Sequence, residues 1–169
     1  MNGQALPLIW LLSDARNDAG LKAALRALPE GSGFIFRHYH LDPAERRRRF
    51  EELAAAARER GHVVVLSGDE DWGADGHYGA AERLRSGLRL ATAHNGDEIE
   101  AAIEARADGI FLSPVFPTAS HPGGATLGTM GFSVLAQQSP VPVIALGGMN
   151  ADRARELNWP RWGAIDGLS

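Results

Sequence analysis

The sequence predicts an α/β protein that folds as a TIM (β/α)8 barrel, and three observations lead to this prediction. Short apolar segments alternate with helix-like segments along the chain. No connection between them calls for an antiparallel hairpin. Eight segments can be counted as strands, which is the number that a closed barrel needs.

The size of the chain limits this prediction. It has 169 residues, whereas a TIM barrel usually has about 250. With 44% hydrophobic and 22% charged residues, the chain can bury one core, so we expect a single domain over residues 1–169. Because the chain is short, a flavodoxin-like open sheet is the structural alternative.

Composition excludes several classes of function. A formal net charge of -4 and a pI near 5.8 give no electrostatic footprint for nucleic acid. The absence of cysteine excludes disulfides, zinc-thiolate sites and thiol catalysis. The longest apolar run, residues 6–12, is too short to span a bilayer or to serve as a secretory signal. We therefore expect a cytoplasmic protein without a membrane partner.

The first two βα units carry clear signals. Residues 7–12 predict a buried strand, and Asn17 or Asp18 can cap a helix that ends at Leu28. Residues 34–39 predict the second strand.

The second helix has a strong start signal. Asp42 suits its N-cap, Pro43 its first position and Glu45 its third position. The helix is expected to continue to Arg60, where a glycine follows.

Four consecutive arginines, residues 46–49, lie on this helix. Neighbouring helical residues are about 100° apart, so the four cannot form one face for a phosphate or a nucleic acid. Several glutamates lie within pairing distance along the helix. We therefore interpret the arginines as a solvated, salt-bridged helix surface.

The remaining strands follow at short intervals. They are expected at residues 62–66, 74–79, 88–94, 108–115, 141–146 and 164–168. Helices are expected at residues 80–86, from the Asn95 cap to Arg106, and after the Asn150 cap.

Two of the outer helices are reduced. The segment between the third and fourth strands is so short that the third helix is vestigial, and no eighth helix follows the eighth strand. The groove beside the first and last strands then needs cover from the N-terminal segment, a partner subunit or further residues. We expect a homo-oligomer.

Two strand ends predict a ligand site. The loop after the sixth strand is stiffened by prolines and carries Thr118, Ser120 and His121 as donors, as a ligand lid would. Gly147 and Gly148 follow the seventh strand, where side chains would obstruct a ligand and bare amides favour a phosphate. The alternative is an ordinary strand-to-helix turn.

The motifs at these strand ends resemble a known family. They read Leu-Ser-Pro-Val-Phe-Pro-Thr-Ala-Ser-His-Pro-Gly and Pro-Val-Ile-Ala-Leu-Gly-Gly-Met, and over residues 88–157 the sequence is similar to the thiamine phosphate synthase and TenI family. The resemblance implies a TIM barrel and a small phosphorylated thiazole ligand. It also implies that Gly147, Gly148 and the segment ending at Ser169 form the phosphate cradle.

The resemblance extends to residues inside the barrel. In the TenI branch, the histidine that matches His94 is the general acid/base of thiazole aromatisation, and Thr92 shares its strand face. Arg37 matches an arginine inside the family's barrel. The alternative for His94 is a histidine that only caps the next helix.

The sequence departs from the synthase pattern at its metal ligands. Ser67 and Gly68 occupy the positions of an Asn-Asp pair, and no acidic residue follows the fourth strand at residues 78–81. We therefore predict no metal site and no cofactor, with magnesium only if the protein is a synthase. Three functions remain open: a TenI-like thiazole tautomerase, a thiamine phosphate synthase, and a non-catalytic ligand-sensing or interaction barrel.

Overall fold

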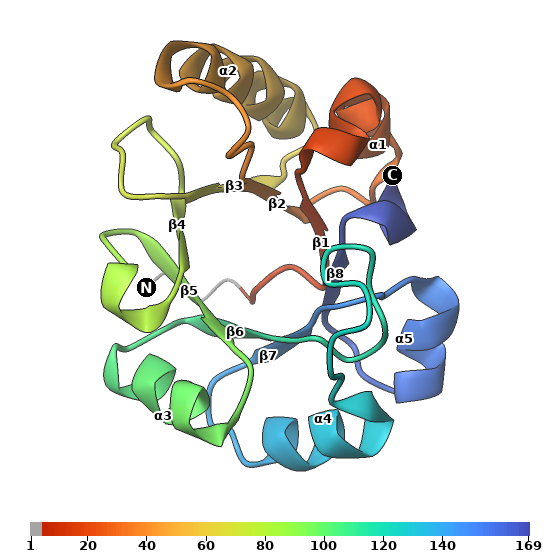
Figure 1. The fold of residues 1–169 in the computed structure, drawn as a ribbon. Helices are drawn as coiled ribbons and strands as arrows, with labels where there is room; N and C mark the ends of the chain where they lie inside the picture. The colour runs from red at the N-terminus through yellow and green to blue at the C-terminus, as the bar shows by residue number, and fades with distance from the viewer. Residues whose placement is uncertain (1–4) are drawn as a thin grey trace.

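Residues 5–169, the part of the chain that the computed structural model describes, form a closed barrel of eight parallel strands (Figure 1). The strands are β1 (Ile9–Leu12), β2 (Gly33–Phe36), β3 (Val63–Ser67), β4 (Gly76–Gly79), β5 (Leu88–Ala93), β6 (Gly109–Leu112), β7 (Val143–Ala145) and β8 (Trp162–Ala164). Each strand pairs with the next in sequence, and β8 closes on β1 with Ile9 opposite Trp162. The TIM barrel is confirmed, and the open sheet is excluded.

Helices surround most of the barrel. The described residues form the α helices α1 (Leu21–Ala27), α2 (Pro43–Glu59), α3 (Gly96–Glu104), α4 (Gly128–Gln137) and α5 (Ala151–Leu157). The side chains of Asp42, Asn95 and Asn150 accept from backbone N–H groups at the starts of α2, α3 and α5, as expected. The chain between β3 and β4 forms no helix, which confirms the vestigial third helix. No helix in the described part of the chain is long and apolar enough to cross a membrane.

Three local predictions were wrong. Asp14, and not Asn17 or Asp18, caps the first helical segment, a 3₁₀ helix at Ala15–Gly20, because Asp14 directly precedes this segment and forms a capping box with Asn17. The expected helix at residues 80–86 is only a 3₁₀ turn, Ala81–Arg83. The eighth strand lies at Trp162–Ala164 rather than 164–168, where pairing with β1 fixes its register.

The second strand is also shorter than expected. It ends at Phe36, because His38 has a φ of 45° and turns the chain out of the sheet. Arg37 therefore projects from the loop that follows β2, and residues 37–39 do not belong to the strand.

Large side chains fill the base of the barrel. The Trp10 ring packs edge-to-face on Phe111, with centroids 5.7 Å apart. Gly33 leaves room for Trp10, since a Cβ there would lie 2.1 Å from the indole ring. The buried residues of this interior cluster are Trp10, Leu12, Ile35, Val65, Leu90, Phe111, Ile144 and Ile165. The base is thus solid, and a ligand can enter only from the carboxyl ends of the strands.

The groove between the first and last units is covered by the chain itself. Leu168, in the 3₁₀ turn Asp166–Leu168 that follows β8, packs against both outer core clusters, one under α1 and α2 and the other under α3, α4 and α5. The described chain therefore supplies part of the cover that we expected from an N-terminal segment or a partner. The homo-oligomer remains a prediction.

Candidate active site

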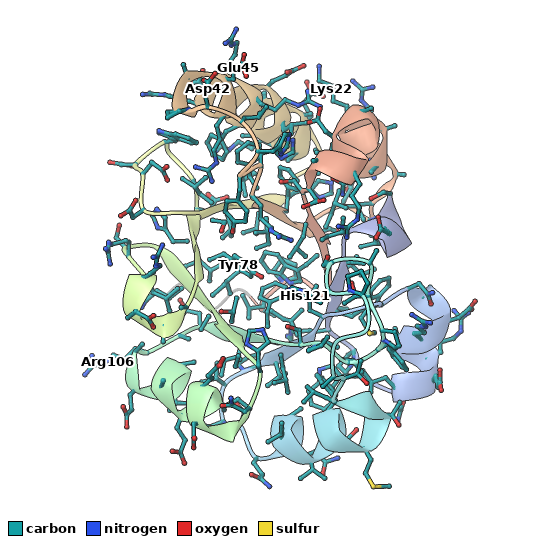
Figure 2. All side chains as sticks on the ribbon, viewed as in Figure 1. Lys22, Asp42, Glu45, Tyr78, Arg106 and His121 are labelled. Carbon is teal, nitrogen blue, oxygen red and sulfur yellow. The ribbon has the colours of Figure 1, made fainter. Side chains whose placement is uncertain are left out.

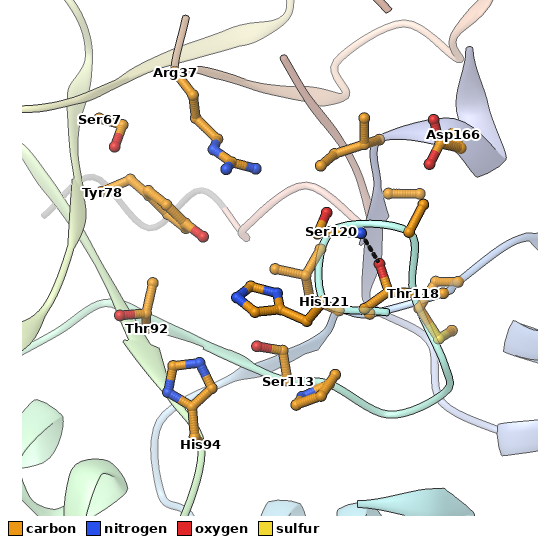
Figure 3. A pocket seen from close by; sticks show the side chains of 18 of the residues that line it. Arg37, Ser67, Tyr78, Thr92, His94, Ser113, Thr118, Ser120, His121 and Asp166 are labelled. Atoms are coloured by element: carbon orange, nitrogen blue, oxygen red, sulfur yellow. Dashed lines mark hydrogen bonds between the residues drawn. The ribbon is translucent and has the colours of Figure 1, made fainter. Parts of the chain in front are cut away.

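The strand ends open into one cavity of about 1260 Å³ (Figure 3). Its wall contains every ligand or catalytic residue named from the sequence except Ser169. These residues are Arg37, Thr92, His94, Thr118, Ser120, His121, Gly147 and Gly148. Figure 2 shows Tyr78 and His121 over the centre of the barrel, whereas Lys22, Asp42 and Glu45 lie on its outside.

Ser169 does not reach the cavity. Its hydroxyl donates to the Ile165 carbonyl and accepts from Asn17 Nδ2 at 3.1 Å. Because β8 ends earlier than expected, Gly167 takes the place on the cavity wall that we had assigned to Ser169.

Glycine stands at positions 147 and 148 for a steric reason that differs from the one we expected. Gly147 has a φ of 102° and Gly148 a φ of 63°, which favour glycine. A Cβ on Gly147 would lie 2.5 Å from Pro114 Cα, and one on Gly148 would lie 2.4 Å from the Pro117 carbonyl oxygen. The glycines thus let the loop after β6, residues 113–124 and called the lid loop below, pack on the loop after β7, rather than only clearing space for a ligand.

The amides of these glycines are available to a ligand. Within residues 5–169, neither the Gly147 nor the Gly148 N–H has a hydrogen-bond acceptor. Both residues line the cavity. Two free amides side by side can bind an anion such as a phosphate oxygen.

An arginine that we did not identify from the sequence ties the lid loop to the rest of the rim. Arg16 Nη2 donates to Ser120 Oγ at 3.0 Å and pairs with Asp166 Oδ2 at 3.1 Å. The Ser120 N–H in turn donates to Thr118 Oγ1 at 3.2 Å (Figure 3). Arg16 thereby joins the loops after β1, β6 and β8. Its position directly after the first strand was the available signal, because such loops form the rim of a barrel.

Asp166 is the second residue that we missed. It lines the cavity with a side chain that is 57% exposed, and its carboxylate pairs with Arg16. A negative charge on this wall repels a phosphate, and the pairing with Arg16 reduces that repulsion.

His94 is both a cavity residue and part of a helix cap. Its Nδ1 lies 3.0 Å from Glu98 Oε2, and its backbone N–H donates to the same oxygen at 3.1 Å. The two side chains are 56% and 44% exposed. A carboxylate at Nδ1 favours the tautomer with the proton on Nδ1, which leaves Nε2 as the basic nitrogen. The capping alternative and the acid/base hypothesis are therefore compatible.

Arg37 and Tyr78 form a polar floor opposite the lid. The Arg37 guanidinium lies 5.4 Å from the centre of the Tyr39 ring and has no carboxylate partner among residues 5–169. The Tyr78 ring packs on Phe111, with centroids 5.3 Å apart. Burial raises the pKa of the Tyr78 hydroxyl to about 12, so that it stays protonated and can donate to a ligand. Both side chains point into the cavity in Figure 3.

The four arginines of α2 have different environments. Arg47 pairs with Glu51, and Arg49 pairs with Glu52 and Asp18, as expected of a salt-bridged surface. Arg46, in contrast, is buried. The prediction of a solvated surface was wrong for Arg46, because this side chain points inward to the loops after β2 and β3.

Arg49 also contacts a buried polar cluster beneath Arg37. His38 Nε2 lies 2.5 Å from Asp18 Oδ1, and His38 Nδ1 lies 2.8 Å from Ser13 Oγ. Burial lowers the pKa of His38, which the bond to Asp18 opposes and the nearby His40 and Arg49 reinforce. Burial would raise the pKa of Asp18, but its bonds from His38 and Arg49 lower it overall.

We expect this cluster to make stability pH-dependent. The folded protein binds fewer protons than the unfolded chain at His38, so its stabilisation is complete above the ordinary histidine pKa of 6.5 and is lost as the pH falls below it. Asp18 has a lowered pKa too, so its contribution is lost only below 3.8. Urea midpoints measured across this range test the expectation. In His38→Asn, the loss between pH 6.5 and 3.8 should shrink, and an unchanged profile would assign it to another group.

The acidic residues in the loop after β3 have different partners. Asp69 is 70% exposed and lies 4.0 Å from Arg85 Nη2, while Glu70 pairs with Arg46. No three histidine, aspartate or glutamate side chains within residues 5–169 are grouped so that they could hold a metal ion. Magnesium at a phosphorylated substrate is commonly held by one or two carboxylates together with phosphate oxygens and water, and of the acidic residues in the loop after β3 only Asp69 lines the cavity.

Comparison with known proteins agrees with this architecture. The family model described as thiamine monophosphate synthase matches residues 74–162. Thiamine-phosphate synthase from Geobacillus thermodenitrificans is 34% identical over 108 residues, which cover 63% of this chain and 46% of that protein. Thiamine-phosphate synthase from Methanoregula boonei is 31% identical over 121 residues, which cover 63% and 56%. The chain thus spans about half the length of these curated relatives.

Solved structures show the same fold. Thiamine phosphate pyrophosphorylase from Pyrococcus furiosus superposes with a TM-score of 0.76 at 21% identity, covering 93% of this chain and 84% of that one. FabK from Thermotoga maritima superposes with a TM-score of 0.71 at 16% identity, covering 96% and 58%. At these identities the likeness concerns the fold alone.

The fold and the cavity define a TIM-barrel protein with an open cavity at the carboxyl ends of its strands. Within that class, the chain belongs to the thiamine monophosphate synthase family, because the family model matches more than half of it. The family resemblance seen in the sequence motifs is confirmed.

Proposed function

We propose that the protein binds a thiazole phosphate in this cavity and acts as a TenI-like thiazole tautomerase. The observation that carries the proposal is the His94–Glu98 pair, which shares one cavity with the free amides of Gly147 and Gly148. The amides would bind the phosphate, and Arg37 and Tyr78 would contact the opposite end of the ligand. Family membership supports the choice of a thiamine-related ligand.

The proposed reaction is a proton transfer. His94 Nε2 takes a proton from one position of the thiazole ring system and returns it to another, so no atom is gained or lost. Glu98 holds the Nδ1 proton and stabilises the imidazolium that forms between the two transfers. The neighbouring Thr92 hydroxyl, half-buried on the same wall, helps to orient the ring.

Replacing His94 with asparagine tests this reaction. Asparagine keeps a polar group beside Glu98 but cannot accept and release a proton near neutral pH, so the proton-exchange rate of the thiazole ligand should fall by about 10²-fold or more. Ligand affinity, measured by calorimetry, should change by less than about threefold, because His94 is not a phosphate contact. His40→Asn is the matched control, since His40 lies outside the cavity wall. An unchanged exchange rate in His94→Asn would falsify the assignment.

A synthase is the second candidate. It is favoured by the names of the two curated relatives, whereas Asp69 is the only acidic residue in the loop after β3 that lines the cavity and could hold magnesium beside a diphosphate. Thiamine phosphate formed by purified protein from thiazole phosphate, a pyrimidine diphosphate and magnesium would establish it. Protection from heat by the thiazole phosphate without either reaction would identify the third candidate, a ligand-sensing barrel.

A further inference from the structure

A chain of hydrogen bonds runs through two buried side chains, from the backbone of Arg37 to a partly exposed carboxylate beside α2. The Arg37 N–H donates to Ser13 Oγ at 2.7 Å, and Ser13 Oγ lies 2.8 Å from His38 Nδ1. His38 Nε2 lies 2.5 Å from Asp18 Oδ1. Ser13 and His38 are 0% and 1% exposed, so water does not compete for the bond between them, whereas the Asp18 side chain at the far end is 38% exposed.

The donors and acceptors along this chain have one consistent direction. The ionised Asp18 carboxylate can only accept, so the His38 proton lies on Nε2 and is donated to Asp18. A neutral His38 then has a bare Nδ1, which accepts from the Ser13 hydroxyl, and Ser13 Oγ accepts from the Arg37 N–H. Arg49 Nε donates to the same Asp18 oxygen at 2.9 Å and compensates its charge. Bonds aligned in this way polarise and strengthen one another.

A second contact fixes the other side of Arg37. Its carbonyl accepts from Arg46 Nε at 2.9 Å. The next residue, His38, leaves the sheet with a φ of 45°, and its ring stacks on Phe36 at 4.7 Å with an 11° angle between the planes. Both peptide groups of Arg37 are thus held, and its side chain projects into the cavity.

The order Ser–His–Asp is also that of hydrolytic triads, but hydrolysis does not fit here. Ser13 is fully buried, and its hydroxyl is occupied by the Arg37 N–H and by His38. A substrate carbonyl cannot reach it. The cluster is therefore available for another role, which is to hold a neighbouring group in place.

We propose that Ser13, His38 and Asp18 form a positioning relay that orients Arg37 toward an anionic group of the ligand. The inference rests on the proposed function in one respect, that Arg37 contacts a charged ligand in the cavity. A guanidinium without a carboxylate partner gains most from an anion when its backbone is already fixed, because little entropy is then lost on binding. The three relay residues do not line the cavity wall, so they act through Arg37.

Sulfate, a simple dianion, is the probe for this relay. We expect Arg37→Ala and Ser13→Ala each to weaken sulfate binding by about tenfold in calorimetry at neutral pH, the equivalent of one charge-assisted hydrogen bond. His38→Ala should weaken sulfate binding to a similar extent, because it removes both the acceptor of the Ser13 proton and the donor to Asp18. His38→Asn should recover part of this loss, because its side-chain amide oxygen can replace Nδ1 toward Ser13 and asparagine tolerates a positive φ.

A matched control separates positioning from general destabilisation. His62 is also buried and bonded through both ring nitrogens, to the Ser32 N–H and the Leu25 carbonyl, but it does not line the cavity. His62→Gln should lower Tm and leave sulfate affinity unchanged. Weak binding in Arg37→Ala together with unchanged binding in Ser13→Ala would overturn the relay and leave the proposed function intact. Unchanged binding in both variants would overturn the anion-binding role of Arg37 and the relay with it.

Discussion

Replacing Arg46 with methionine is expected to lower the free energy of unfolding by about 3 kcal/mol, at the lower end of the range for breaking a buried ion pair. Arg46 donates to Glu70 Oε1 at 3.0 Å and to the carbonyl oxygens of Arg37 and Ser67 at 2.9 and 2.5 Å. Methionine fills much of the volume but leaves the two carbonyls and the carboxylate without this donor. Glu70 is 39% exposed, so water offsets part of the loss.

Aromatic rings surround the same guanidinium. The centres of the Trp72, Phe36 and Tyr39 rings lie 5.2, 5.6 and 6.0 Å from the carbon of the group. Cation–π attraction is stronger where the cation is shielded from water, so these contacts add to the loss. Because Arg46 joins the loops after β2 and β3, the variant should also loosen the cavity wall that carries Arg37.

Urea unfolding measures this effect, and the same helix supplies the control. Arg47 is 59% exposed, and among residues 5–169 it pairs only with Glu51, which is 61% exposed. Arg47→Met should therefore change the free energy of unfolding by about 0.5 kcal/mol or less. Equal losses in the two variants would contradict the distinction between a buried and a solvated arginine.

The arginines also show which features the sequence could predict. The caps at Asp42, Asn95 and Asn150 were predicted correctly, because each depends on residues three positions apart. Arg46 stands four residues before Phe50 and seven before Leu53, so it lies on the buried face of α2, and helical periodicity could have singled it out among the four arginines. Its partner Glu70 could not be predicted, because it lies 24 residues away.

The residues of the candidate site also fall into two groups: those that the local sequence predicts and those that depend on distant parts of the chain. His94 and the paired glycines carry local signals, namely a strand face and a turn. The Arg16–Asp166 pair joins residues 150 positions apart and forms only when β1 and β8 close the barrel. Ser169 was misplaced for the same reason, since the register of β8 is fixed by β1 and not by its own short sequence. Contacts that close the barrel are therefore those that a single sequence does not reveal.

Replacing Gly147 with alanine is expected to lower the free energy of unfolding by about 4 kcal/mol, from an unfavourable φ and from overpacking together. The added Cβ would lie 2.5 Å from Pro114 Cα and 2.9 Å from the Val115 nitrogen, which are backbone atoms that cannot rotate away. The lid loop would have to move. Its hydrogen bonds from the Val115 N–H to Leu146 and from the Phe116 N–H to Gly147 would then weaken.

A second glycine provides the control that separates the steric role of Gly147 from a general intolerance of alanine. Gly131 lies within α4, and a Cβ there would meet Leu127 Cβ at an ordinary 3.7 Å. Gly131→Ala should raise stability by about 0.5–1 kcal/mol, because alanine loses less entropy on forming a helix. Thermal unfolding of both variants, with and without the thiazole phosphate, tests the pair. If Gly147→Ala unfolds like the unmodified protein and still gains stability from the ligand, the lid loop does not depend on this close approach.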